Sequence, residues 1–274
     1  MNWSPLRPQQ EIRAWWGRVF GATVRHGAHT VIVKDPSALE NAQLLASHFG
    51  VPDTAVVTSI SPRSVQLRSF SPHMEVEQCF QTSLAVMSAL AAPIGEPWEV
   101  GHHEGAPLRV VREPGAVWAS VPHQDRPGVH TAHVPDGFPR GEAVLLRHTR
   151  SRLHVRLDDV EDLERLQVAS TQVMRICEQE KVSGVVVSGP VRDQQVRVRV
   201  FTTSFEGAED LTTGGAVWGV GFLEALDGRR GAITALQGPD LRQRHGRLLL
   251  RLRHNQTVDL GGEVVPLMEG SLLL

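Results

Sequence analysis

The stretch Glu209-Asp210-Leu211-Thr212-Thr213-Gly214-Gly215-Ala216 runs directly into an apolar segment at residues 217–226. This pattern predicts a loop with two carboxylates that opens into a buried helix. The first turn of a helix exposes unpaired backbone N–H groups, and the helix dipole makes that end attractive to anions. Gly214 and Gly215 carry no side chain that would block a ligand. The stretch therefore suggests an anion site beside a carboxylate. The alternative is an ordinary N-cap by Thr212 or Thr213, followed by a glycine turn.

The two halves of the chain share one order of predicted elements. In the first half, strands and a surface helix at 38–49 precede an apolar, buried helix at 81–91. In the second half, strands and a helical region at 160–180 precede the buried helix at 215–226. A repeat of about 130 residues is too long for a solenoid, whose periods are roughly 20–50 residues. The repeat indicates a duplicated domain with pseudo-twofold symmetry.

The predicted fold class is α+β, with two pseudo-symmetric lobes that each wrap a rolled mixed β-sheet around a central buried helix. The predicted domains are an N-terminal lobe at 1–120, a crossover linker at 121–144 and a C-terminal lobe at 145–274. The linker is rich in Pro, Gly and His, as connections between domains often are. The last residues are strand-like throughout, and the final strands are free to return to the N-terminal lobe.

Composition narrows the function classes. The chain of 274 residues is 41% hydrophobic and 21% charged, as soluble globular proteins are. A net charge of −2 gives no attraction to nucleic acid or anionic lipid, and no apolar window reaches the roughly 18 residues that a membrane span needs. The two cysteines, Cys79 and Cys177, fit a reducing cytosol. We therefore expect a cytoplasmic protein that binds neither nucleic acid nor a membrane.

Histidines near the predicted linker are the candidates for a metal site. Their spacing matches no compact ligand motif, so we predict that the protein binds no metal there. These residues are His102, His103, His123, His130 and His133, with Glu104 beside them.

Several segments, spread over most of the chain, carry a common pattern. They are residues 27–33, 51–56, 79–84 and 209–216, followed by Gln237-Gly238, Gly246-Arg247-Leu248 and Gly261-Gly262. In this order they resemble the PhzF family, which is named for the isomerase of phenazine biosynthesis and shares the diaminopimelate epimerase fold. The best match is the loop at 209–216, which is similar to the family's Glu-Asp-Pro-x-Thr-Gly-Ser-Ala.

The resemblance implies a cofactor-independent isomerase or epimerase of a small carboxylate-bearing metabolite. Its site would lie in the cleft between the lobes, where both buried helices point their N-termini at the substrate carboxylate and a side-chain carboxylate moves a proton at carbon. The resemblance also implies a homodimer, and neither a metal nor an organic cofactor. The implied catalytic residues are Asp53, Asp210 and Gln81, and the implied substrate-binding residues are Cys79, Phe80, Thr82, Thr213, Gly214 and Gly215.

The chain departs from the family at positions that carry the chemistry. Asp53 replaces a glutamate and shortens the acid by roughly 1.5 Å, while displacements near 1 Å can cost about a hundredfold in rate. The alternative for Asp53 is an exposed turn acid after Pro52. Gln81 replaces a histidine, so it can orient a substrate but cannot exchange a proton near neutral pH. Gly215 replaces a serine and loses a hydroxyl contact.

Two further positions leave alternatives open. Phe80 replaces a glycine and either narrows the cleft or packs in the core. Cys79 has Thr213 as its pseudo-symmetric counterpart, so a mechanism with two cysteine bases is not predicted. The departures also favour a degenerate relative that binds a small acid, or that serves as a structural or interaction protein. A weaker alternative is another reaction in the same cleft that recruits Cys79 or a histidine.

Overall fold

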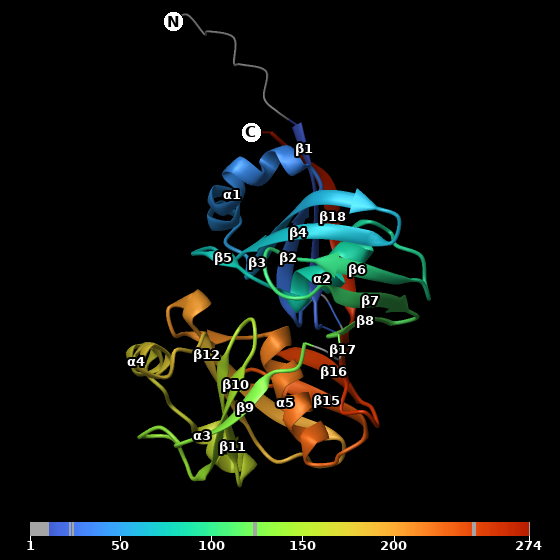
Figure 1. The fold of residues 1–274 in the computed structure, drawn as a ribbon. Helices are drawn as coiled ribbons and strands as arrows, with labels where there is room; N and C mark the ends of the chain where they lie inside the picture. The colour runs from blue at the N-terminus through green and yellow to red at the C-terminus, as the bar shows by residue number, and fades with distance from the viewer. Residues whose placement is uncertain (1–10, 22, 24, 123–124, 243–244, 274) are drawn as a thin grey trace, which may run out of the picture.

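The structure, a computed structural model, describes residues 11–21, 23, 25–122, 125–242 and 245–273. Two lobes lie one against the other, and each wraps strands around one central helix (Figure 1). The central helix is α2 (Phe80–Ala89) in the N-terminal lobe and α5 (Gly214–Leu226) in the C-terminal lobe. Nearly every residue of both helices is buried, as expected for helices that are apolar on all sides. The architecture is the predicted α+β class.

The strands of the N-terminal lobe pair in the order β18-β1-β2-β3-β4-β6-β7-β8, with β5 on the side of β4. The surface elements η1 (Pro36–Asn41) and α1 (Ala42–Phe49) connect β2 to β3. The strands are β1 (Glu11–Val19), β2 (Ala28–Val33), β3 (Asp53–Ser61), β4 (Ser64–Phe70), β5 (Glu75–Val76), β6 (Pro97–Gly101), β7 (Leu108–Glu113), β8 (Ala116–Ser120) and β18 (Val264–Leu273).

The C-terminal lobe repeats this order as β9-β10-β11-β12-β13-β15-β16-β17, with β14 on the side of β13. In each lobe the two parallel pairs fall at equivalent places, β2–β3 with β4–β6 and β11–β12 with β13–β15. The strands are β9 (Gly128–Ala132), β10 (Gly141–Arg147), β11 (Arg152–Leu157), β12 (Gly184–Ser188), β13 (Gln195–Thr202), β14 (Glu209–Asp210), β15 (Gly231–Gln237), β16 (Gly246–Leu252) and β17 (Val258–Gly262).

The lobes are joined by strands as well as by the chain. β8 pairs antiparallel with β17, so one continuous sheet passes from lobe to lobe. β18 crosses back and pairs along the whole of β1, which places the end of the chain in the N-terminal lobe (Figure 1). The segment 121–144 is not simply a linker, because β9 and the first part of β10 lie in it and belong to the second sheet.

The helical region predicted at 160–180 is two helices, α3 (Val160–Arg165) and α4 (Ser170–Glu180). The Arg199 guanidinium of β13 donates to the carbonyl oxygens of Leu163 and Leu166, at 3.3 and 2.6 Å. These carbonyls lie at the end of α3, where the intrahelical pattern of hydrogen bonds runs out; the Leu163 carbonyl also accepts from the Leu166 amide at 3.3 Å. A tertiary contact therefore satisfies the end of α3 at the break.

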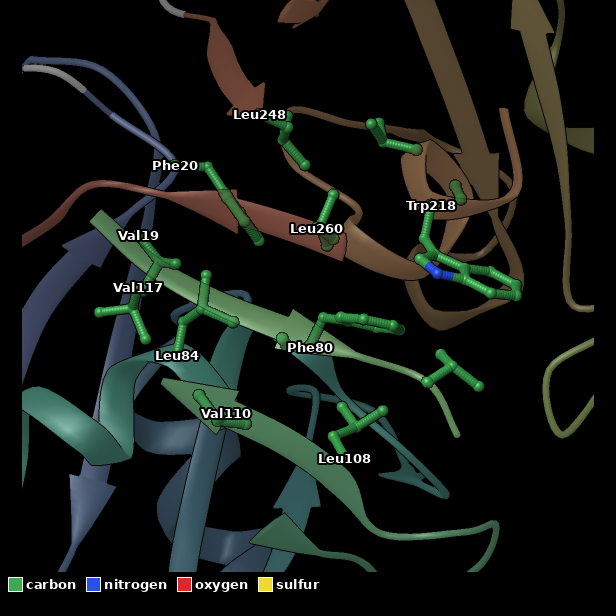
Figure 2. Close-up of a cluster of buried hydrophobic side chains, with 14 of the residues drawn as sticks. Val19, Phe20, Phe80, Leu84, Leu108, Val110, Val117, Trp218, Leu248 and Leu260 are labelled. Carbon is green, nitrogen blue, oxygen red and sulfur yellow. The ribbon is translucent and has the colours of Figure 1, made fainter. Parts of the chain in front are cut away.

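One apolar core passes through both lobes. It contains side chains from α2 and α5 and from strands of both sheets. In Figure 2, Phe80 of α2 extends toward Trp218 of α5, with Phe20 and Leu260 beside them. Because buried apolar surface contributes about 25 cal/mol per Å², this shared core holds the lobes against each other. In the described part of the chain, no helix has both the length and the apolarity to cross a membrane.

Candidate active site between the lobes

A cavity lies where the first residues of α2 and α5 meet. It is lined from both lobes, and its lining contains every predicted site residue except Thr82. The lining includes Asp53, Cys79, Phe80, Gln81, Arg150, Arg152, Asp210, Thr213, Gly214 and Gly215. The fold thus brings together residues that are more than 150 positions apart in the sequence.

Both helix starts offer backbone donors. Cys79 is the N-cap of α2 and its sulfur accepts a hydrogen bond from the Thr82 amide at 3.5 Å, while Thr213 is the N-cap of α5. Within the described ranges, the amides of the first two residues of each helix, at positions 80, 81, 214 and 215, donate to no protein acceptor. Such amides lie at the positive end of the helix dipole, an arrangement that suits an anion.

The loop before α5 is held by Asp210 and Gln237. The Asp210 carboxylate accepts from the Thr212 amide at 3.2 Å and from the Thr213 hydroxyl at 2.5 Å. The Gln237 amide in turn donates to the Asp210 carbonyl at 2.7 Å and accepts from the Thr213 amide at 2.9 Å. Burial raises the pKa of Asp210 to about 6, against the opposing effect of these hydrogen bonds. The loop therefore fixes a carboxylate that ionises close to neutral pH.

Asp53 begins β3 on the other side of the cavity. It is partly buried rather than the exposed turn acid of the alternative interpretation. Burial, and then the charge of Asp210, raise the pKa of Asp53 to about 7, although Arg150 and the Cys79 thiol act in the opposite direction. Burial also raises the pKa of the Cys79 thiol above its usual range. A carboxylate with a pKa near 7 can both take and return a proton at neutral pH.

The side-chain amide of Gln81 is hydrogen-bonded to other residues of the protein. Its Nε2 donates to the Thr30 hydroxyl at 2.9 Å, and its Oε1 accepts from the Thr212 hydroxyl at 3.0 Å. Thr30 belongs to the N-terminal lobe and Thr212 to the C-terminal lobe, so this buried amide ties the two lobes together. An orienting role toward a substrate stays a prediction.

Phe80 is both a core residue and part of the cavity wall. Its ring stacks on Trp218 with a centroid distance of 6.4 Å, and the side chain is buried. A Cβ at Gly214 would lie 2.6 Å from the Phe80 Cβ, so the glycine at the start of α5 makes room for the bulky residue at the start of α2. The cavity remains beside this contact.

Thr82, unlike the other predicted site residues, does not line the cavity. Its hydroxyl lies 2.9 Å from the Ser69 hydroxyl and the residue is completely buried away from the cavity. The third residue of α2 faces the sheet because a helix turns by about 100° per residue.

The histidines near the linker that the structure describes do not form a metal-binding cluster. His102 is half-buried, with Nε2 2.8 Å from the Ser83 hydroxyl, and desolvation lowers its pKa to about 4. His123 lies outside the described residues. Across the described ranges, no three His, Cys, Asp or Glu side chains are grouped so that they could hold a metal ion.

Two arginines in the cavity were missed by the sequence analysis. Arg150 donates to the Ser204 hydroxyl at 2.8 Å and pairs with Glu77 at 3.5 Å. Arg152, at the start of β11, is 6% exposed and lines the cavity next to the start of α5. In sequence, Arg152 and His154 alternate with apolar residues as on an ordinary half-exposed strand, and only the structure shows that both faces of β11 are buried.

The two lobes, with a pair of carboxylates and two helix starts around one cavity, define an epimerase-like fold with an interlobe site. The chain belongs to the PhzC-PhzF family of phenazine biosynthesis-like proteins, whose family model matches residues 19–270. No curated protein matches its sequence.

Solved structures share this fold. A PhzF family protein of Bacillus anthracis is similar with a TM-score of 0.77 and 16% identity, over 97% of this chain and all (100%) of the other. A predicted epimerase of Pseudomonas aeruginosa has a TM-score of 0.76 and 19% identity, over 96% and 99% of the two chains. A hydroxyproline epimerase of Agrobacterium vitis, with bound trans-4-hydroxy-L-proline, has a TM-score of 0.65 and 11% identity, over 98% and 94%. At such identities the likeness concerns the fold.

Proposed function

We propose that this protein is a cofactor-independent isomerase that moves a proton on a small carboxylate-bearing metabolite in the interlobe cavity. One observation carries the proposal. Two carboxylates from opposite lobes, Asp53 and Asp210, line the same cavity as two helix starts with free amides, and both carboxylates have raised pKa values. Perturbed carboxyl groups in a cavity with anion-binding amides are what proton transfer on an acid requires.

In the proposed reaction, ionised Asp53 takes a proton from a carbon next to the ligand's carboxylate. The electron pair of the broken C–H bond delocalises toward that carboxylate, whose growing charge is stabilised by the amides of Gly214 and Gly215. Protonated Asp53 then returns the proton to the same carbon or to another carbon of the conjugated system. The charge of Asp210 helps to keep the pKa of Asp53 near 7, so both forms of Asp53 are populated at neutral pH.

The other cavity residues have supporting roles in this proposal. The raised pKa of Cys79 keeps its side chain a neutral thiol, so Cys79 is not a second base. The thiol interacts with Asp53. Phe80 and Trp218 form an apolar wall that excludes water from the carboxylates. Gln81 connects the two lobes and so fixes the cavity residues of one lobe relative to those of the other. The two ends of the ligand contact residues that are positioned in this way.

A second candidate is a protein that binds a small acid without turning it over. The observation that favours it is Gln81, whose amide is engaged with both lobes at the position where the family has a histidine. In this case the free amides bind the acid, and no second group completes the proton transfer.

Solvent exchange distinguishes the two candidates. Small amino and hydroxy acids are first screened for ligands that raise the melting temperature, because a ligand at about 100 times its Kd stabilises by about 2.7 kcal/mol. Each ligand found is then incubated with the protein in D2O, and loss of its C–H signal is followed by NMR. We expect exchange with the wild type and none with Asp53→Asn, which should still bind.

Asp158→Asn is the matched control, since Asp158 is an exposed acid of the same charge outside the cavity. Exchange that continues unchanged in Asp53→Asn removes Asp53 from the mechanism. A wild type that binds an acid and exchanges no proton supports the second candidate.

A further inference from the structure

The contact between β11 and α5 is built around two glycines. A Cβ at Gly215 would lie 3.2 Å from Nη1 of Arg152, and a Cβ at Gly219 would lie 2.6 Å from Cε1 of His154. Four residues of a helix advance by about 6 Å, and two residues of a strand by about 6.6 Å. Because these spacings match, α5 has a glycine opposite each of Arg152 and His154, whereas Arg156, two residues further along β11, pairs with Glu224 of α5 at 3.1 Å.

Arg152 is poorly paired for a buried cation. Within the described ranges, its one hydrogen bond runs from Nη1 to the Arg150 carbonyl at 3.3 Å, and its Nε has no acceptor. Asp210 and Glu77 act on Arg152 through space, yet among the described residues no carboxylate forms an ion pair with it. Burial lowers the pKa of Arg152 to about 9, which reflects this unfavourable environment.

The position of Arg152 adds to this cost. Its guanidinium lies at the start of α5, beside Gly215, where the helix dipole disfavours a cation. An anion at the same place would interact favourably with the guanidinium, with the dipole and with the free amides of Gly214 and Gly215. Arg150 is less suited to bind this anion, because its guanidinium already pairs with Glu77 and donates to the Ser204 hydroxyl.

We infer that Arg152 binds a carboxylate group of the ligand, together with the amides of Gly214 and Gly215. The inference rests on the proposed function, since it concerns the same cavity. Gly215 stands where the family has a serine, and its missing side chain leaves the space that the guanidinium occupies. The chain therefore recognises the ligand by a full charge at this point, and it selects acids over their neutral amides.

The inference is tested by calorimetric binding of malonate, malonamide and inorganic phosphate. We expect the wild type to bind malonate and to reject malonamide, its neutral diamide. Arg152→Met should weaken malonate binding by about 10- to 100-fold, the usual range for a charge-assisted hydrogen bond. Without malonate, the same variant should melt at the wild-type temperature or above it, because an unpaired buried cation has been removed.

Arg147→Met is the matched control. Arg147 donates to the carbonyls of Glu180 and Lys181 outside the cavity, so its loss should leave malonate binding unchanged. If Arg152→Met does not fold, Arg152→Lys serves instead: it keeps the charge but loses the planar fork, and a weakening of about fivefold or more is expected.

The outcomes separate the inference from the proposed function. Malonate binding that is equal in the wild type and in Arg152→Met overturns the role of Arg152 and leaves the acid-binding cavity intact. Phosphate that binds more tightly than malonate, and depends on Arg152, overturns the assignment of a carboxylate. A wild type that binds no acid, either here or in the wider screen, rejects the cavity as an acid site and the inference with it.

Discussion

Replacement of Asp53 by asparagine should stabilise the protein at alkaline pH and leave its stability nearly unchanged at acid pH. Burial, and then the charge of Asp210, raise the pKa of Asp53 from 3.8 to about 7. A carboxyl group with a raised pKa in the folded state contributes stability below its unfolded pKa and loses that contribution as pH rises through its folded pKa. Each pKa unit corresponds to about 1.36 kcal/mol, so the whole loss is about 4 kcal/mol.

Urea unfolding at pH 5 and at pH 8 measures this effect. Between pH 5 and pH 7 the folded wild type holds a proton on Asp53 that the unfolded chain has already released. The unfolding free energy of the wild type should therefore fall by about 2.7 kcal/mol between pH 5 and pH 7. Asp53→Asn should not show this loss. The measured quantity is the difference in unfolding free energy between the two proteins, which should favour the variant increasingly as pH rises.

Asp35→Asn is a control with the opposite sign. Asp35 precedes η1 and accepts hydrogen bonds from the amide and hydroxyl of Ser37, which lower its pKa. The Asp35 carboxylate stabilises the folded protein above its unfolded pKa, and this stabilisation is lost as pH falls through its folded pKa. Asp35→Asn should therefore be less stable than the wild type at neutral pH. A free-energy difference for Asp53→Asn that is the same at pH 5 and pH 8 refutes the reasoning about Asp53.

Three further substitutions test the packing around the site. Gly214→Ala should destabilise by about 1–3 kcal/mol, because its Cβ would lie 2.6 Å from the Phe80 Cβ; an unchanged melting temperature contradicts the close contact of the helix starts. Glu209→Gln should cost about 3–5 kcal/mol in urea unfolding, because it leaves buried Arg199 without its carboxylate at 2.6 Å. Gln81→Leu should cost about 1–3 kcal/mol, because it leaves two buried hydroxyls unpaired. An equally large loss of acid affinity in Gln81→Leu would instead place that amide on the ligand.

The duplicated fold could be predicted because its signals are local. In the first surface segment, Asp35 caps the 3-10 helix η1 through its side chain, and Gly50 ends α1 in a left-handed conformation; both are residue types that favour these positions. The apolar helices α2 and α5 are visible in sequence because their burial allows few polar residues on any side. The family pattern then orders these elements into two lobes.

The remaining features depend on contacts between distant residues. β9 reads as a connector because its residues are mostly exposed, and its strand conformation comes from pairing with β10. At the break between α3 and α4, carbonyl oxygens accept from Arg199, which is more than 30 residues away. Arg152 looks like an ordinary strand arginine until the structure places Gly215 against it. Such pairings leave no periodic signal in either partner.

The most direct measurement for the whole account is a pH titration of the aspartate side chains by NMR, with ¹³C-labelled aspartate, in the absence and presence of malonate. We expect one carboxyl to titrate near pH 7 and one near pH 6, assigned to Asp53 and Asp210 by their Asn variants. Both resonances should move when malonate is added. If Asp53 and Asp210 instead titrate near pH 4 and do not respond to malonate, the two carboxylates do not share an acid-binding cavity.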